Sequence, residues 1–346
     1  MLTMLNGTAR RNVRTGLQVM ASGGALLVVL SVLLWSVDRE IAPTLSALLR
    51  NGFGDRLALT ETLVRMTPLL LCALAVAIPA KAGLFNIGAE GQLHAGAIGA
   101  SGVALFASFL HPVALLPTMM LVAALAGCLW GVIPGWLRGR WGVNEVLVGL
   151  MLNYVAILAV QHLVHGPWKD LSALGWPYTA RFAASAKLPT LGATNVHLGL
   201  ALGIAGCGLG WVLLRSTTWG VSLRVIGQAP RAARHLELPL VRHIAVVLAV
   251  GAIFAALAGL GEVSVVQGRL RPGISAGYGY SGFLISWLVG NHLLLLIPAA
   301  FVVAGLYSGA DALQLTAGLP SATADVFVGL VFVAALWLRA GRQVTS

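Results

Sequence analysis

Long apolar stretches alternate with short polar ones along almost the whole chain. About 20 consecutive apolar residues is the length that crosses the hydrocarbon core of a bilayer as a helix. The pattern predicts about ten transmembrane helices, near residues 16–37, 62–80, 85–108, 113–137, 146–165, 196–214, 243–264, 281–291, 293–313 and 323–338. We therefore expect an all-α polytopic membrane protein, with tails at residues 1–15 and 339–346 and a membrane domain at residues 16–338.

One segment breaks this pattern with glycine and polar side chains. The stretch KAGLFNIGAEGQLHAGAIGAS, residues 81–101, places Asn86, Glu90, Gln92 and His94 among five glycines. Polar side chains at membrane depth are costly, and non-helical backbone is tolerated there only inside protein or beside a water-filled cavity. We expect this first break to line a path for a polar molecule.

A second break, RPGISAGYGYSG, occupies residues 271–282 and contains Tyr278 and Tyr280. In the predicted layout the two breaks enter the membrane from opposite sides. Paired, glycine-interrupted segments of opposite orientation are typical of an inverted repeat with a central substrate site. Glycines also simply let helices pack closely, but the polar and aromatic residues embedded in both breaks favour a path.

Composition supports a membrane protein, because the chain is 58% hydrophobic and only 10% charged. The net charge of +11 would suggest nucleic acid as a partner of a soluble protein, but here the position of the basic residues matters more. With the N-terminus inside, 13 of the 22 Lys and Arg residues lie on the inner side. We expect both termini in the cytoplasm, membrane lipid as the surroundings and no nucleic acid.

The three cysteines show no disulfide or metal-ligand spacing.

Several polar residues have two interpretations. Glu90 either pairs with a helix N-terminus or with Lys81, or serves as a proton-coupling acid; the scarcity of other acids at depth favours the structural role. Asn153 shares a helix face with Glu145, roughly 12 Å away, and either lines the path or bonds to a neighbouring helix.

The aromatic candidates for the path are Tyr154, Tyr278, Tyr280 and Trp287. Each could stack on a nucleobase. Each could equally be a membrane anchor at the lipid–water interface.

The longest inner loop, residues 215–242, is basic and contains a short helix candidate at residues 229–236 that begins at Pro230. Anionic lipid would attract such a loop. Its small face, Ala232 and Ala233, is better suited to docking on a soluble partner. The candidate docking residues are Arg224, Gly227, Pro230, Ala232, Ala233 and Arg234. Because the chain has no G-x-x-x-x-G-K-[ST] phosphate loop, any ATPase must be a separate subunit.

Four motifs together resemble those of the bacterial ABC-importer permeases for nucleosides and simple sugars, a family of the branched-chain amino acid type. They are GLFNIGAEGQ (residues 83–92), GVNEVLVGLMLNY (142–154), GVSLRVIGQAPRAARHLELP (220–239) and RPGISAGYGYSG (271–282). The chain looks most like the longer permease subunit of general nucleoside importers. One departure is Gly149, where family members tend to carry a hydroxyl residue.

The resemblance implies an assembly of two related permeases and two ATPases, fed by an extracytoplasmic substrate-binding protein in the inner membrane of a bacterium. Residues 229–236 would be the coupling helix, ATP-Mg would bind the partner ATPase, and this chain would bind no cofactor and catalyse no reaction. The expected function is nucleoside import. The alternatives are a simple-sugar permease and a stand-alone ion-coupled transporter; a membrane enzyme is disfavoured because no HExxH or GxSxG motif occurs.

Overall fold

The computed structural model describes residues 41–107, 109–172, 174–192 and 194–317, together with six residues between 326 and 337. Within these ranges the regular structure is helical and no β-strand is formed. The predicted span at residues 16–37 and both predicted tails lie outside the described residues, as do ten of the sixteen residues of the span at 323–338.

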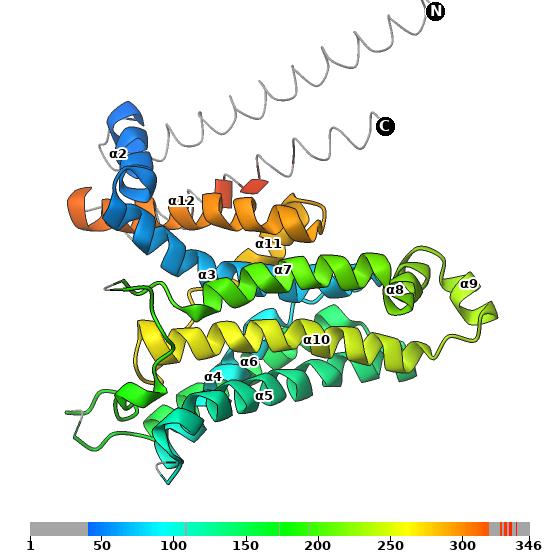
Figure 1. Cartoon of the computed structure of the whole chain (residues 1–346), viewed down its shortest axis with the longest axis horizontal. Coiled ribbons are helices and arrows are strands. Elements are labelled where there is room, and N and C mark those ends of the chain that lie inside the picture. Colours follow the sequence, from blue (N-terminus) through cyan, green and yellow to red (C-terminus); the bar gives the residue numbers. More distant parts are fainter. Residues whose placement is uncertain are drawn as a thin grey trace, which may run out of the picture. The chain divides into compact units, whose positions relative to one another are not determined.

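Most of the helices follow one another with short connections, whereas a long segment, residues 166–197, joins α6 to α7 (Figure 1). The α-helices are α2 (Ile41–Phe53), α3 (Arg56–Ala80), α4 (Ala89–Phe106), α5 (Pro112–Trp141), α6 (Glu145–His165), α7 (Leu198–Ser216), α8 (Thr218–Gln228), α9 (Pro230–His235), α10 (Leu240–Gly261), α11 (Tyr278–Leu288) and α12 (Leu296–Ala317). Shorter helical turns are η1 (Ala184–Ala186), η2 (Glu262–Val266) and η3 (Leu293–Leu295).

Six helices of the described part are long and apolar enough to cross a membrane: Arg56–Ala80, Pro112–Trp141, Glu145–His165, Leu198–Ser216, Leu240–Val266 and Leu293–Gln314. Each corresponds to one of the predicted spans. The predicted span at 85–108 is shorter than expected, because the backbone stays non-helical until α4 begins at Ala89. The predicted short span at 281–291 is α11, which has 11 residues.

Two details of the prediction were wrong. Helix α3 starts at Arg56, six residues before the predicted span, because its first turns are helical although polar. Helix α2 was not predicted at all. It has 13 residues and is amphipathic, which is too short for the length criterion that identifies a span.

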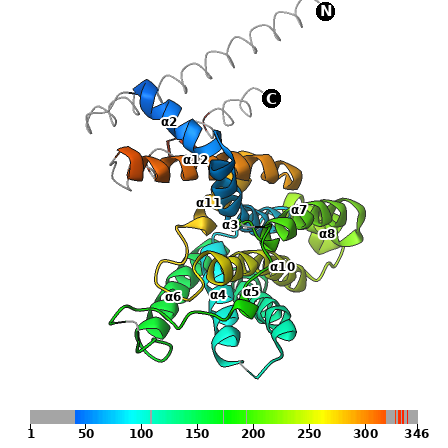
Figure 2. The same cartoon turned by 60° about the vertical axis from the view of Figure 1, so that its left-hand side comes forward.

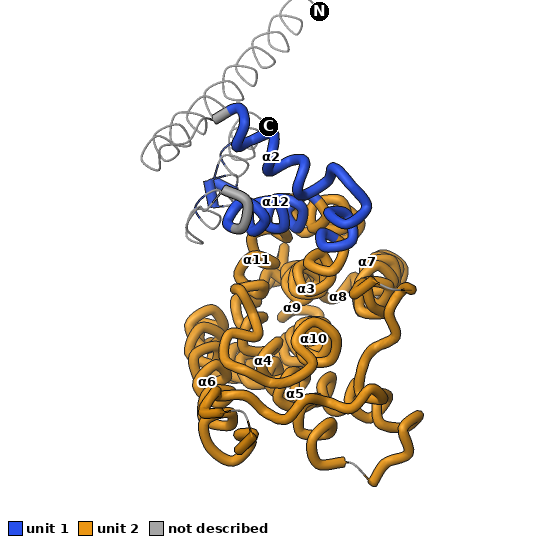
Figure 3. The backbone as a smooth tube through the Cα atoms, turned by 90° about the vertical axis from the view of Figure 1, so that its left-hand side faces the viewer, with its two compact units in different colours: residues 1–62, 302–346 blue, residues 63–301 orange. Residues whose placement is uncertain are grey.

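The described chain divides into two compact units, residues 1–62 with 302–346 and residues 63–301 (Figure 3). In the first unit, glycines allow α2 and α12 to approach closely. The backbone of Gly52 lies against that of Gly305, and Gly309 lies against the carbonyl of Leu48. Thr62 closes the end of α2 by donating its hydroxyl to the Gly52 carbonyl at 2.7 Å.

In the second unit, α10 packs along α5 and α4 (Figures 1 and 2). The contact with α5 depends on glycines at every fourth position, Gly127, Gly131, Gly135 and Gly139, which form one stripe on that helix. A Cβ atom added at Gly131 would lie 2.8 Å from the Leu248 carbonyl oxygen of α10. Small residues at this spacing let two membrane helices pack backbone to backbone.

The segment that follows α6 covers the connection between α10 and α11. Thr179 exchanges two hydrogen bonds with Leu270, one backbone bond of 3.1 Å and one to its hydroxyl of 3.0 Å. Ser264 accepts from the backbone N–H of Leu188 at 2.9 Å. These bonds place the loop after α6 and the second break at the same end of this unit.

Candidate functional site

The first break keeps a non-helical backbone at residues 81–88, between α3 and α4, and a pair of buried amides holds it. Asn86 and Gln92 bond to each other twice, at 3.0 and 2.9 Å, and both are at most 2% exposed. Asn86 also donates to the Ala75 carbonyl of α3 at 3.0 Å. The two predicted path residues are therefore satisfied by each other, and their observed contacts hold the non-helical backbone in place.

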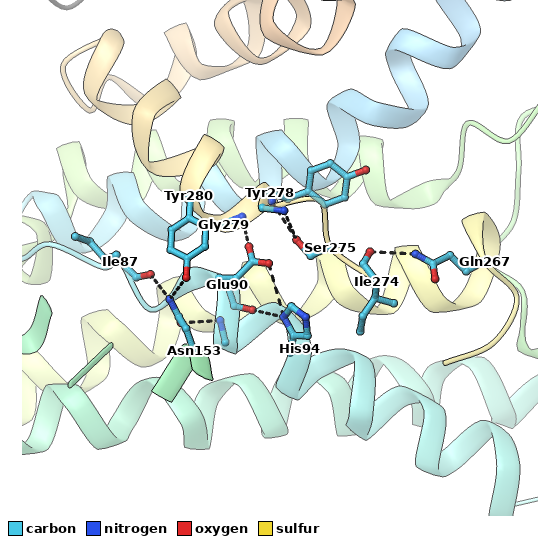
Figure 4. A network of polar contacts seen from close by, with 12 residues as sticks. Ile87, Glu90, His94, Asn153, Gln267, Ile274, Ser275, Tyr278, Gly279 and Tyr280 are labelled. Carbon is cyan, nitrogen blue, oxygen red and sulfur yellow. Dashed lines mark hydrogen bonds and ion pairs between the residues drawn. The ribbon is translucent and has the colours of Figure 1, made fainter. Parts of the chain in front are cut away.

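Glu90 joins the first break to the second. Its Oε2 atom accepts a hydrogen bond of 2.8 Å from the backbone N–H of Gly279, in the first turn of α11 (Figure 4). A carboxylate is favourable at a helix N-terminus, where free N–H groups carry partial positive charge. Of the two structural partners considered for Glu90, the structure gives it the helix N-terminus and not Lys81. His94 lies beside it, with Nδ1 2.8 Å from the Glu90 carbonyl.

Asn153 of α6 bonds to both breaks from one buried side chain (Figure 4). Its Oδ1 atom accepts from the Gly91 N–H at 2.8 Å, and its Nδ2 atom donates to the Ile87 carbonyl at 3.0 Å. The same nitrogen lies 3.2 Å from the hydroxyl of Tyr280, in the second break. The two breaks, far apart in sequence, therefore meet at α6.

Glycine residues allow α6 to approach the first break this closely. A Cβ atom at Gly149 would lie 3.0 Å from the backbone nitrogen of Gly88, and one at Gly91 would lie 2.8 Å from Asn153 Oδ1. Gly149, the departure from the family pattern, thus lets α6 lie directly on the first break. The glycines therefore allow close packing at the place where the polar residues converge.

Glu145, at the start of α6, connects this helix to the first break and to α5. Its carboxylate accepts from the backbone N–H of Phe85 at 3.3 Å and lies 3.3 Å from Nε of Arg138 on α5. Glu145 and Asn153 do share a face of α6, as their spacing predicts, and both are buried. That face is turned toward the first break.

An exposed aromatic face borders this network. Tyr280 is 38% exposed and Tyr154 is 61% exposed, at the edge where Asn153 is buried. Trp287 follows two turns along α11 and packs against Phe85 and Phe283, with ring centroids 5.7 and 5.5 Å apart. Sequence analysis missed Phe85 and Phe283; the only signal was the position of Phe85 inside the first break.

Tyr278 does not belong to this face. Its ring is turned away from Tyr280 (Figure 4) and packs, partly buried, against an apolar cluster that includes Leu71 and Leu93. Residues two positions apart in an α-helix are rotated by about 200° and so point to opposite sides of it. The predicted pair of tyrosines is therefore split between the core and the exposed face.

Glu262 is a second buried acid that the sequence analysis did not single out. It is 3% exposed and begins η2, a π-helical turn of five residues at the end of α10. Such turns interrupt regular α-helix and are frequent at functional sites. Gln267, Arg65 and Arg271 are its polar neighbours. An apolar run with one acid gives no sequence signal for a π-helical turn.

The basic loop contains two helices, α8 and α9, where the sequence predicted one. Helix α9 begins at Pro230 as expected, and Ala232 is exposed. Ala233 is buried, so its side chain packs inside the chain and is not part of the exposed face of α9. Pro230 and Arg234 are exposed beside Ala232.

Helix α8 of the basic loop rests directly on the first break. A Cβ atom at Gly227 would lie 2.8 Å from the backbone of Ala82 and Gly83, in the turn that opens the break. Arg224 is anchored one turn earlier, where its guanidinium donates to the Leu214 carbonyl of α7 at 2.6 Å. The loop and the first break thus form one contiguous contact.

Comparison with known proteins identifies related permeases. The family model described as branched-chain amino acid transport system, permease component, matches residues 58–336. The chain is 35% identical to the glucose ABC transporter permease protein TsgB13 of Haloferax volcanii, over 93% of this chain and 85% of the relative. It is 31% identical to the guanosine ABC transporter permease protein NupP of Bacillus subtilis, over 90% and 88%. The nucleoside ABC transporter permease protein NupB of Lactococcus lactis is 27% identical over 83% and 81%.

Proposed function

The chain belongs to the branched-chain amino acid transport system permease family, and on that premise we propose that it is the membrane subunit of an ATP-driven importer of nucleosides. It is a multi-pass membrane protein and a transport subunit. Two of the relatives above are named as permeases for guanosine or nucleosides, which supports the proposed substrate class.

The observation that carries this proposal is the meeting of the two breaks beside an exposed aromatic face. A nucleoside offers a flat base and a hydroxylated sugar. Tyr280 and Trp287 supply rings on which a base could stack, a contact worth about 1–3 kcal/mol where it has been measured in nucleic-acid sites. Asn153 and the Tyr280 hydroxyl supply polar groups at the same edge.

Because this face is exposed in a single chain, we propose that a second, related permease completes the path. Tyr154 on α6 would then face the partner permease and the substrate, although within the described chain it lies outside the buried network. This arrangement makes each chain one half of the translocation path, and substrate would reach it from an extracytoplasmic binding protein.

We further propose that a separate ATPase, carrying ATP-Mg, docks on the basic loop at Pro230, Ala232 and Arg234. The contact between Gly227 and Gly83 supports this proposal, because it gives the loop a direct mechanical route to the first break. Movement of α8 would displace the turn at residues 81–83, and through it the amide pair that holds the break.

The proposed topology has both termini in the cytoplasm of an inner membrane, with about ten spans arranged as an inverted repeat. The described contacts support its sidedness: the basic loop lies on the turn at Lys81, and the loop after α6 lies on residues 268–270, directly before the second break. In a cysteine-free variant, a label at Ala184 should react from outside and one at Arg231 from inside. The reverse accessibility would refute this topology.

Import of a simple sugar is the second candidate, because the glucose permease relative is 35% identical. Uptake of labelled guanosine and labelled glucose, in cells with and without this chain, separates the two. We expect guanosine uptake to depend on the chain and to resist competition by excess glucose. Loss of glucose uptake alone on deletion would assign the sugar instead.

A further inference from the structure

A pocket of about 210 Å³ lies at the end of α7 near the basic loop, away from the network at Asn153. It is built by four separate segments: the turn after α3, the last turn of α7, the first half of α8 and the turn before η3. Its lining residues are Lys81, Trp211, Leu214, Arg215, Gly220, Arg224, His292 and Leu293. Three of them are permanent or near-permanent cations and none is an acid.

The cations of this pocket are held together by contacts that leave their charges uncompensated. The Arg224 guanidinium donates to the neutral Leu214 carbonyl at 2.6 Å, and that of Arg215 lies 5.3 Å from the centre of the Trp211 ring. Lys81 has no carboxylate partner in the part of the chain that the structure describes. Burial lowers the pKa of the Lys81 ammonium, and the nearby Arg224 charge lowers it further. Such a cluster is suited to a bound anion.

The surroundings of the pocket are those of a membrane surface. Its wall combines the guanidinium groups with the apolar side chains of Leu214 and Leu293. Exposed apolar residues border it: Trp211 of α7, which is part of its wall, and Leu294 and Leu295 of η3, which directly follow its Leu293. A carboxylate side chain of a soluble protein would leave these apolar residues uncovered, whereas the acyl chains of a lipid would cover them.

We propose that this pocket binds the phosphate of an anionic phospholipid in the leaflet that faces the basic loop, with the acyl chains along α7. Basic pockets between transmembrane helices on the cytoplasmic side are known to hold lipid headgroups. The lipid would bridge the turn at Lys81 and helix α8 at Arg224. These are the segments that also meet at Gly83 and Gly227, so the lipid would brace the contact between loop and break.

Native mass spectrometry of the intact, delipidated transporter complex tests this proposal by titration with phosphatidylglycerol, phosphatidylcholine and inorganic phosphate. We expect preferential binding of phosphatidylglycerol by the wild type. The double variant Lys81→Gln/Arg215→Gln should bind it roughly 30-fold more weakly, the effect of two cations at an anionic surface. Arg140→Gln, an exposed cation at the end of α5 outside the pocket, is the matched control and should bind like the wild type.

Four results would overturn the proposal. They are equal binding of the two lipids by the wild type, equal loss in the control, displacement of phosphatidylglycerol by inorganic phosphate at matched concentration, and normal lipid binding by a double variant that no longer assembles with the ATPase. The last result would mean that an acidic side chain occupies the pocket. If the double variant fails to fold, Arg215→Gln alone replaces it, with an expected loss of about fivefold.

Discussion

Asn153 is the residue on which the two breaks depend most directly. One buried amide satisfies the Gly91 N–H, the Ile87 carbonyl and the Tyr280 hydroxyl. A leucine of similar size would leave these groups without that partner in a site with little access to water. Each buried group left unsatisfied costs about 1–3 kcal/mol.

We expect Asn153→Leu to slow nucleoside uptake at least about tenfold, because one lost hydrogen bond of this kind is worth about that factor. The affinity of the binding protein for its ligand should not change. Initial uptake rates and the melting temperature of the purified complex measure the two effects. Gln161→Leu, an exposed amide on the same helix, is the control and should leave both nearly unchanged. Wild-type uptake by Asn153→Leu would show that the breaks do not need this link.

A substitution at Glu90 distinguishes ATP-driven import from proton-coupled transport. A glutamine at this position keeps an oxygen that accepts from the Gly279 N–H, but it removes the charge at the helix N-terminus, a change worth about 0.3–1 kcal/mol. We expect Glu90→Gln to retain most uptake, with the same dependence on external pH as the wild type. A variant that loses accumulation together with its pH dependence would make Glu90 a proton-coupling acid.

The sequence was sufficient to predict which polar residues belong to the site, but not which group each of them bonds to. Asn86, Glu90, Gln92 and Asn153 are all buried and each is hydrogen-bonded, which follows from the cost of polar groups at depth. Their partners depend on which glycines let the backbones touch, and no local pattern encodes that. Ala233 shows the same limit, because a small residue on a short helix can face the core as easily as a partner.

At the scale of helices, the apolar pattern located six spans of the described chain and failed where the helix is not regular. The π-helical turn at Glu262 and the late start of α4 at Ala89 both depend on tertiary contacts. Helix α2 is too short for hydropathy to detect. The stripe of glycines on α5 was visible in the sequence, but its partner, α10, was not.

Helix α8 transmits movement only if it stays in contact with the first break. Adding a methyl group at Gly227 would bring a carbon atom to 2.8 Å from the backbone of Ala82, so one of the two segments must shift. We expect Gly227→Ala to lower the amount of nucleoside imported per ATP hydrolysed, by about twofold or more, while ATPase activity persists. The order of magnitude follows from the 1–3 kcal/mol that overpacking costs.

The control for this variant is Gly208→Ala on α7, where an added Cβ has no neighbour within 4 Å. It makes the same chemical change in a helix without forcing a shift. Equal coupling in both variants would show that the contact between α8 and the break carries no movement.

On the scale of the whole molecule, we propose that this chain forms half of a translocation path and that a separate subunit hydrolyses ATP. The aromatic face at Tyr280 and Trp287 is open in one chain, and the basic loop carries its exposed residues on a helix of only six residues, α9. In the proposed assembly, a second permease covers the first feature and an ATPase binds the second.

The most direct test of this account is nucleoside uptake into proteoliposomes that contain the two permeases, the ATPase and the binding protein. We predict uptake that requires ATP, stops when the ATPase is replaced by a variant that cannot hydrolyse it, and continues when ionophores collapse the proton and sodium gradients. Uptake that persists without ATP and disappears on addition of ionophores would contradict the account and make the chain an ion-coupled transporter.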